Sequence, residues 1–405
     1  MQENAKKVPE LRFKGFTDAW EQRKLEEMAE FLDYGLNAPA KVYDGINKYI
    51  RITDIDDSSR EFNLNSLTSP DIELNGNENY ILKNQDILFA RTGASVGKSY
   101  RYRNADGLVY FAGFLIRARI KPEFDVSFLF QHTLTSKYGS FVRVTSQRSG
   151  QPGINAQEYG NFKVYIPLLS EQQKIGGLIN NLDSLISLHK RKLEKITSLK
   201  SAYKQKLFPL KFLTAPNLRF SLSKSEWRNH KIKELFTERS QRSSEGELIS
   251  VTINSGVIKA SSLKRKDNSS EDKSNYKIVK RNDIAYNSMR MWQGASGYSP
   301  YDGILSPAYT VINPNLGTNS KFFAYYFKLP YVIQQFQKHS QGLTSDTWNL
   351  KFPALSQMSF FCPDFEEQNA IVKHLEKLDY LISIQSEKIS HLEDMKKSYL
   401  QKMFI

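Results

Sequence analysis

The chain has 405 residues, 40% hydrophobic and 25% charged, which suggests two or three folded domains. Its formal net charge of +14 indicates either a polyanionic partner or simply a basic surface. The single cysteine excludes internal disulfides and multi-cysteine zinc sites. No apolar run is long enough to span a bilayer, and the start, MQENAKKVPE, lacks an apolar signal core. We expect a cytoplasmic protein without membrane association.

The sequence repeats itself. PELRFKGFTDAWEQRKLEEM (9–28) returns without a gap as PNLRFSLSKSEWRNHKIKEL (216–235), and residues 166–208 return as 362–404. The second pair shares Pro167/Pro363, Glu171/Glu367, Gln172/Gln368, Asp183/Asp379, Tyr203/Tyr399 and Lys206/Lys402. Such internal similarity predicts a duplicated architecture. We predict a first body over 1–165, a helix and linker over 166–215, a second body over 216–361 and a second helix over 362–405.

Each body mixes strands with short helices. In the first, residues 87–90, 109–120 and 162–166 have the composition and alternation of strands, and residues 127–142 have a helical pattern. Residues 320–337 have a helical pattern at the matching place of the second body. We therefore predict α+β bodies. The lone cysteine, Cys362, lies in the strand-like run SFFCPDF and is expected to be a small buried hydrophobe.

The two terminal segments are predicted to be long helices, the first over 170–208. Apolar residues recur at alternating steps of four and three, as in a coiled-coil seam. The seam includes Leu182, Ile186, Leu193 and Ile196 in the first helix and Leu378, Ile382, Ile389 and Leu392 in the second. His189, Lys200, Gln385 and Lys396 are matched polar positions, and we interpret His189 as structural. The pattern predicts an antiparallel helix pair of about 58 Å that joins two pseudo-symmetric bodies.

The stretch ARTGASVGKS (90–99) resembles a nucleotide-binding loop but has one residue too few between its glycines. A strand precedes it, yet a strand and a turn follow it, whereas a phosphate loop requires a helix. The matching stretch of the second body, MWQGASGYS, has no Gly-Lys. An NTPase site at Gly93–Ser99 remains an alternative hypothesis, which ATP hydrolysis lost in Lys98→Ala would support.

Two polar loops in each body carry groups suited to nucleic acid, since Arg, Gln and Asn read base edges and hydroxyl or Lys groups hold phosphates. In the first body the candidates are Arg91, Thr92, Ser95, Lys98, Gln147, Arg148 and Gln151. In the second they are Arg290, Trp292, Gln293, Ser296, Tyr298, Thr344, Thr347 and Asn349, with Asp346 in the same loop. Lys98 is expected to hold the DNA backbone, with Arg91 and Thr92 nearer the bases. No catalytic, cofactor or metal motif is found.

The chain resembles the DNA-specificity subunit of type I restriction-modification systems over nearly its full length. The resemblance rests on the duplicated Pro-x-Leu-Arg-Phe…Trp starts, the Asp-Ile-Leu-Phe-Ala-Arg-Thr-Gly and Gly-Gln-Pro-Gly-Ile-Asn runs, and the two helices that end in Tyr-x-Gln-Lys-Leu/Met-Phe. The loop of the second body lacks the Arg-Thr-Gly…Gly-Lys pattern, so its contacts are inferred from residue type alone.

The resemblance implies that the two bodies are target-recognition domains, each reading one half of a bipartite double-stranded DNA site. It implies that the helices set the spacing and dock two methyltransferase subunits. The subunit itself would bind no cofactor and catalyse nothing. The methyltransferase would use S-adenosylmethionine on adenine N6, and restriction/motor subunits, reached through the methyltransferase core, would use ATP and Mg²⁺. A helical scaffold that does not bind DNA is the remaining alternative.

Overall fold

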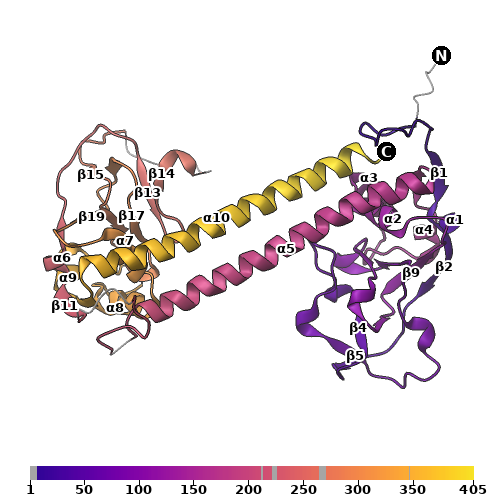
Figure 1. Cartoon of the computed structure of the whole chain (residues 1–405), viewed down its shortest axis with the longest axis horizontal. Helices are drawn as coiled ribbons and strands as arrows, with labels where there is room; N and C mark the ends of the chain where they lie inside the picture. The colour runs from indigo at the N-terminus through magenta and orange to yellow at the C-terminus, as the bar shows by residue number, and fades with distance from the viewer. Residues whose placement is uncertain (1–6, 211–212, 221–225, 264–270, 346) are drawn as a thin grey trace, which may run out of the picture. The chain divides into compact units, whose positions relative to one another are not determined.

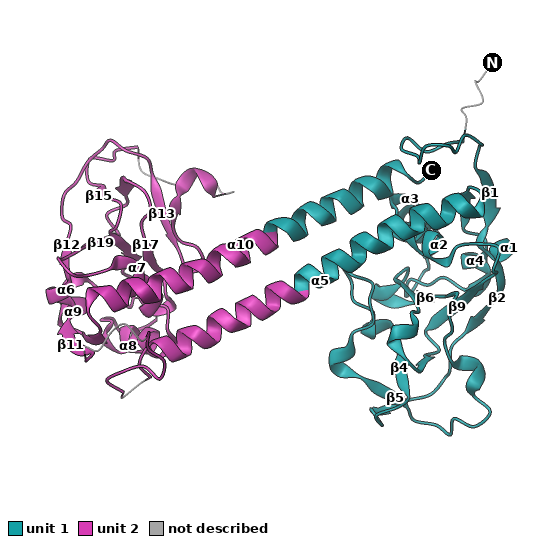
Figure 2. Cartoon of the chain, viewed as in Figure 1, with its two compact units in different colours: residues 1–190, 387–405 teal, residues 191–386 magenta. Residues whose placement is uncertain are grey.

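The computed structural model describes residues 7–210, 213–220, 226–263, 271–345 and 347–405. It divides into two compact units, residues 1–190 with 387–405 (unit 1) and residues 191–386 (unit 2), as Figure 2 shows. The division passes through both long helices, whereas the predicted boundaries placed each helix in a segment of its own. The predicted candidate Asp346 lies outside the described residues.

Unit 1 contains the first body, and Figure 1 labels several of its elements. Its strands are β1 (Glu21–Lys24), β2 (Ala29–Tyr34), β3 (Ala40–Val42), β4 (Lys48–Ile50), β5 (Thr68–Pro70), β6 (Asp86–Ala90), β7 (Ser99–Arg101), β8 (Val109–Phe111), β9 (Leu115–Ile120) and β10 (Lys163–Ile166). Its short helices are α1 (Leu25–Met28), α2 (Val126–His132), α3 (Ser136–Thr145) and α4 (Ala156–Gly160).

Unit 2 contains the second body. Its strands are β11 (Arg228–Lys231), β12 (Phe236–Glu238), β13 (Ile249–Thr252), β14 (Gly256–Lys259), β15 (Lys277–Val279), β16 (Ile284–Asn287), β17 (Ser296–Tyr298), β18 (Gly303–Leu305), β19 (Tyr309–Pro314) and β20 (Ser359–Cys362). Its short helices are α6 (Ile232–Leu235), α7 (Ser320–Tyr326), α8 (Pro330–His339) and α9 (Phe352–Gln357).

The two bodies share the order of their four-stranded sheet and the pairing of their end strands, which confirms the duplication. The four-stranded sheet has the order β2-β9-β6-β7 in the first body and β12-β19-β16-β17 in the second. The strands at the two ends of each body also pair antiparallel, Glu21 with Ile166 and Arg228 with Cys362. Strands and helices are both present in each body, so the α+β prediction is confirmed. Cys362 is buried, as predicted, and burial raises the pKa of its thiol to about 12.

Three predicted elements are each divided in the structure. Residues 127–142 form α2 and α3, and residues 320–337 form α7 and α8. The second break precedes Pro330, which has no N–H to donate to a preceding helical turn and therefore begins α8. Residues 109–120 form β8 and β9 around a turn, in which Gly113 donates its N–H to the carbonyl of Leu36.

The long helices are α5 (Leu169–Leu207) and α10 (Phe365–Lys402), and α5 lies within one residue of its predicted bounds at each end. Lys190 pairs with Glu393 at 2.7 Å and Lys396 with Asp183 at 2.7 Å, so the two helical segments of unit 1 run antiparallel. In unit 2 Lys200 pairs with Asp379. Because both lysines and both aspartates are matched positions of the repeat, one ion pair occurs twice.

The predicted seam residues are covered to different degrees. Leu182, Ile186, Leu378 and Ile389 are buried, whereas Leu193, Ile196, Ile382 and Leu392 are half-buried. Of the matched polar positions, Gln385 is buried and the two lysines make the ion pairs described above. The seam therefore combines apolar packing with charges that favour one register and orientation.

The residues at the C-terminal end of each long helix pack into the core of a body. In unit 1 the ring of Phe404 stacks on Phe128 at 5.2 Å and meets the ring of His132 edge-on at 4.7 Å. In unit 2 Phe208 lies 5.1 Å from Phe322 and 5.0 Å from Tyr326, between ring centroids. These are matched positions of the repeat, so each core is closed by a helix that begins in the other repeat.

Hydrogen bonds of the repeated Leu-Arg-Phe motif hold these helix ends. The N–H of Leu11 donates to the carbonyl of Lys402 at 2.8 Å, and that of Leu218 donates to Lys206 at 2.9 Å. Arg12 makes two hydrogen bonds, of 2.6 and 2.7 Å, to the buried carboxylate of Glu171. Arg219 and Glu367 make the matching pair in unit 2. The motif therefore ties the start of each body to both long helices.

Phe404→Ala is expected to lower the free energy of unfolding of unit 1 by about 3–5 kcal/mol, since it opens a cavity between Phe128 and His132. Denaturant unfolding followed by amide hydrogen exchange would resolve the two units. Leu188→Ala, on an α5 side chain that is 60% exposed, is the control and should cost less than about 0.5 kcal/mol. Equal effects of the two changes would contradict a structural role for the helix end.

Candidate nucleic-acid interface

The two predicted loops of the first body meet. Residues 91–93 lie against residues 152–154, with Thr92 and Gly153 bridged antiparallel. The N–H of Gly93 donates to the carbonyl of Pro152 at 3.0 Å, and the N–H of Ile154 donates to that of Arg91 at 2.9 Å. Residues far apart in the sequence thereby form one surface.

The two predicted loops of the second body meet in the same way, and we call this meeting of two loops the loop crossing of each body. The N–H of Leu350 donates to the carbonyl of Ser288 at 2.8 Å, and these residues match Ile154 and Arg91 of the first body. Beyond the crossing, the indole rings of Trp292 and Trp348 meet edge-on with centroids 5.1 Å apart. The backbone frame is thus common to both bodies, whereas the side chains on it differ.

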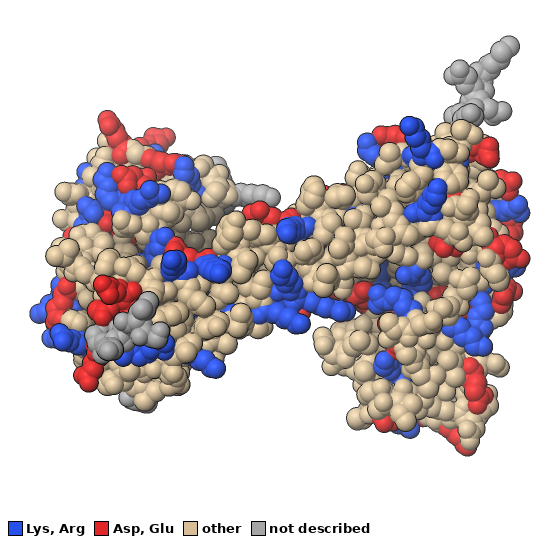
Figure 3. Space-filling model, in the orientation of Figure 1, with Lys and Arg blue, Asp and Glu red and all other residues tan. Residues whose placement is uncertain are grey.

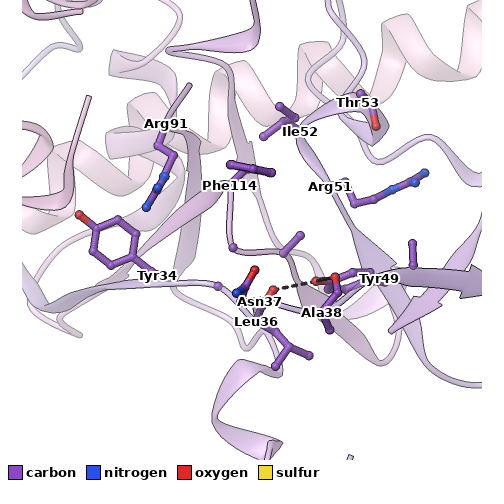
Figure 4. Close-up of a pocket in the computed structure, with 14 residues that line it drawn as sticks. Tyr34, Leu36, Asn37, Ala38, Tyr49, Arg51, Ile52, Thr53, Arg91 and Phe114 are labelled. Carbon is purple, nitrogen blue, oxygen red and sulfur yellow. Dashed lines mark hydrogen bonds between the residues drawn. The ribbon is translucent and has the colours of Figure 1, made fainter. Parts of the chain in front are cut away.

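In the first body Arg91 lies between two aromatic rings at the mouth of a cavity of about 630 Å³ (Figure 4). Its guanidinium carbon is 4.9 Å from the ring centroid of Tyr34 and 6.0 Å from that of Phe114. The hydroxyl of Tyr34 accepts the N–H of Ala156 at 3.2 Å, which fixes the ring against the second loop. Leu36 and Tyr49 supply apolar surface and Asn37 and Thr53 supply polar groups to the cavity.

The other candidates of the first loop pair line its surface. Gln147, Arg148 and Gln151 are exposed, and Thr92 and Ser95 are half-buried. Gly93 has a positive φ of 69°, and a Cβ there would stand 2.8 Å from Nε2 of Gln151, so the Gln151 amide lies directly over this glycine. Arg148 makes hydrogen bonds of 2.5 and 2.6 Å to both carboxylate oxygens of Glu158, which leaves it less available than Arg91.

Lys98 does not join Arg91 on this surface. Its ammonium pairs with Asp57 at 2.6 Å, and its side chain is 15% exposed. The short 3₁₀ turn at Gly93–Ser95 leads into strand β7 rather than a helix. The loop therefore lacks the helix N-terminus that a nucleotide phosphate site requires. Lys98 is largely enclosed within the body, and its predicted contact with the DNA backbone stays a prediction.

In the second body, Arg290, Thr344 and Thr347 are exposed. Trp292 donates its indole N–H to the carbonyl of Met289 at 3.0 Å, so the ring is held on its own loop. The side-chain oxygens of Gln293 and Asn349 are buried and make no hydrogen bond to the described residues. Buried polar atoms of this kind need water or a ligand as a partner.

Two predicted candidates of the second body lie elsewhere. Ser296 is fully buried in β17, so its hydroxyl cannot reach a phosphate in this fold, which corrects that assignment. Tyr298 donates its hydroxyl to Asn282 at 2.9 Å and lies beneath the ammonium of Lys321. It lines a different cavity, with residues of α7 and α10, and is not part of the loop crossing.

Buried polar groups hold both loops in place. In the second body the ammonium of Lys328 donates to the carbonyls of Gly294 and Ile253, and burial lowers its pKa to about 8. In the first body the hydroxyl of Tyr159 donates to the carbonyl of Ala90 at 2.7 Å, and that of Tyr138 donates to Gly97 at 3.0 Å. Burial raises the pKa of both tyrosines, so they remain neutral donors.

Three aromatic residues of this surface were not among the sequence candidates. Trp348 was detectable, since a tryptophan in the polar run Thr347–Asn349 is unusual for a loop without a binding role. Tyr34 and Phe114 come from other segments, and their sequence neighbourhoods carry no such signal. Only the fold brings them to Arg91.

On the face drawn in Figure 3, Lys and Arg side chains are interspersed with Asp and Glu. Within the described part of the chain, no group of three or more His, Cys, Asp or Glu side chains could hold a metal ion. In the same residues no helix is long and apolar enough to cross a membrane. The candidate surface is therefore defined by its loops rather than by a metal or a single basic patch.

Comparison with known proteins identifies one family. A model of the type I restriction modification DNA specificity domain matches residues 17–198 and 224–394. The putative type I restriction enzyme MjaX specificity subunit of Methanocaldococcus jannaschii is 24% identical over 398 residues, covering 94% of this chain and 92% of that protein. The MjaVIII specificity subunit of the same organism is 26% identical over 137 residues, 33% of this chain and 30% of its own length.

Among solved structures, the S subunit of a type I restriction-modification system from M. genitalium has the same fold. The TM-score is 0.64 at 15% identity, and the match covers 98% of this chain and 99% of that chain. The likeness therefore extends over both bodies and both long helices.

Trp292 and Trp348 are expected to stabilise each other across the loop crossing. Replacing each by Leu, singly and together, should reveal a coupling of about 0.5–1.5 kcal/mol in the unfolding of unit 2. Circular dichroism should show an exciton couplet from the two indoles that either single change abolishes. Met289→Ala, a nearby exposed side chain, is the control. Additive effects with no couplet would mean that the two rings are not packed together.

Proposed function

The chain belongs to the family of type I restriction-modification DNA specificity subunits, and we propose that each of its two bodies reads one half of a bipartite target. It is a DNA-recognition subunit of a type I restriction-modification complex and has no catalytic activity of its own. Within the chain, we propose residues 1–165 and 216–361 as the two target-recognition domains, and residues 166–215 and 362–405 as the spacer segments.

One observation carries this proposal: the same loop crossing holds different polar side chains in the two bodies. Ile154 to Arg91 and Leu350 to Ser288 are backbone hydrogen bonds, so they constrain no side chain. Because only backbone atoms hold the two loops together, different side chains can stand at the same position of the loop crossing. Two modules that read different DNA sequences in equivalent orientations require such an arrangement.

We propose that DNA lies against these crossings. The contacts of the first body would come from Arg91, Thr92, Ser95, Gln147 and Gln151, and those of the second from Arg290, Trp292, Gln293, Thr344, Thr347, Trp348 and Asn349. Amide side chains suit adenine, guanidinium groups suit guanine, and hydroxyls suit phosphates. Four predicted residues are left out of this set. Lys98 is paired with Asp57 and Arg148 with Glu158, Ser296 is buried, and Tyr298 lines a different cavity.

The long helices would dock two methyltransferase subunits. Exposed apolar side chains of α5 and α10, namely Leu185, Leu188, Leu199 and Tyr380, suit such contacts. The docked subunits would supply S-adenosylmethionine chemistry at adenine N6. Restriction/motor subunits, joined through the methyltransferase core, would use ATP and Mg²⁺. Because the target is genomic DNA, we propose that the complex acts in the cytoplasm.

If each body reads its own half-site, a chain with two copies of the first body should read a symmetric target. Residues 29–161 would replace residues 236–357, which occupy the matching part of the fold. Sequencing of methylated adenines in cells that also express the methyltransferase subunit should show one half-site unchanged. The other half-site should become its inverted copy. An unaltered motif would contradict the assignment of residues 236–357 to readout.

If the helices set the spacing, lengthening both should lengthen the gap between the half-sites. A seven-residue insertion after Lys190 in α5 and another after Leu392 in α10 preserve the Lys190–Glu393, Lys396–Asp183 and Lys200–Asp379 pairs. Seven residues add about 10 Å of helix, or about three base pairs. The methylated motif should keep both half-sites and gain about three intervening base pairs. A motif whose spacing is unaltered would contradict the role of the helices in setting the gap.

A further inference from the structure

We propose that Arg91 reads a guanine in the half-site of the first body. The inference rests on the proposed function and adds to it the residue that determines specificity and the base that it takes. Three observations support it: the backbone and side chain of Arg91 are fixed by neighbouring segments, no described carboxylate pairs with its guanidinium, and the second body has Ser288 at the matching position.

The backbone of Arg91 is fixed from both sides. Its N–H donates to the carbonyl of Phe114 at 3.0 Å, and its own carbonyl accepts the N–H of Ile154 at 2.9 Å. The two bonds come from different segments, the turn before β9 and the second recognition loop. The Cα of Arg91 therefore has a defined place where these segments meet.

The side chain is positioned as well. The guanidinium lies over the ring of Tyr34, with Phe114 nearby and the cavity beside it, as Figure 4 shows. Tyr34 is held by the N–H of Ala156. Arginine loses considerable rotamer freedom when it binds a ligand, and aromatic contacts that hold it beforehand reduce that cost. A positioned guanidinium also presents its planar edge in one direction, as bidentate readout requires.

The guanidinium of Arg91 also makes no ion pair with any residue that the structure describes. Among the described residues, other arginines of the first body have carboxylate partners, such as Arg117 with Asp33, Arg119 with Asp86 and Arg148 with Glu158. No carboxylate of the described residues lies within ion-pair distance of Arg91. Guanine offers O6 and N7 in the major groove, two acceptors that match two donors of one guanidinium edge.

The second body cannot make this contact in the same way. At the position that matches Arg91 it has Ser288, which is buried and bonded to the hydroxyl of Thr310 at 2.8 Å. Its own reader groups, Arg290 and Trp292, lie on the residues that follow. Because Ser288 replaces Arg91 in the second body, the proposed contact between Arg91 and guanine is specific to the half-site that the first body reads.

A chain assembled with its methyltransferase subunits provides the test. The methylated motif defines the target, and the two-copy chain described above identifies the half-site of the first body. In duplexes that carry this target, each guanine of that half-site would be replaced in turn by 7-deazaguanine, in which a C–H replaces N7. The unaltered complex should bind about tenfold more weakly when one particular guanine is changed. This scan needs no protein variant.

Arg91→Lys keeps the charge but loses the planar fork, and it should remove the sensitivity to that guanine while the dependence of binding on salt stays the same. Thermal unfolding checks that the variant folds, and Val144→Ala, at an exposed side chain of α3 outside the proposed contacts, should retain the sensitivity. If no guanine of the half-site is sensitive, or if Arg91→Lys keeps the sensitivity, Arg91 does not read a guanine. If the two-copy chain leaves the motif unaltered, the proposed function fails, and this inference fails with it.

Discussion

Each body of this protein depends on the end of a helix that begins in the other repeat. Phe404 closes the core around Phe128, and Phe208 closes the core around Phe322. Burying an aromatic ring of this kind is worth several kcal/mol, a large share of the stability of a typical domain. Neither repeat therefore encloses its own core. Each compact unit is built from residues of both repeats.

The loop crossings build on that constraint. Backbone hydrogen bonds and the side chains of Tyr159 and Lys328 hold the loops, so the frame does not depend on the exposed polar side chains that it carries. A side chain at the crossing can change without loss of the frame, as the exchange of Arg91 for Ser288 between the two bodies shows. The frame thus separates the requirements of stability from those of specificity. Duplication followed by divergence of the exposed groups then yields two readers with different preferences.

Much of the candidate site could be predicted from the sequence, because the repeat made two loop pairs comparable. Their polar composition indicated a binding role, and the strand that was predicted to follow Gly93–Ser99, and that the structure contains as β7, argued against a phosphate loop. The sequence could not show that Lys98 pairs with Asp57 or that Ser296 is buried in β17, since distant residues decide both. Tyr34 and Phe114 come to Arg91 only through the fold.

The sequence by itself determined the duplication, the α+β bodies and the two long helices, because internal similarity and apolar periodicity are local and regular. It also placed the bounds of α5 to within one residue, since Pro209 ends the periodic segment. Only the tertiary structure decided which helix end closes which core, that Lys200 and Lys396 pair with Asp379 and Asp183, and that Arg91 lies between Tyr34 and Phe114. These contacts join residues far apart in the chain, and their geometry depends on packing that no single stretch of sequence encodes.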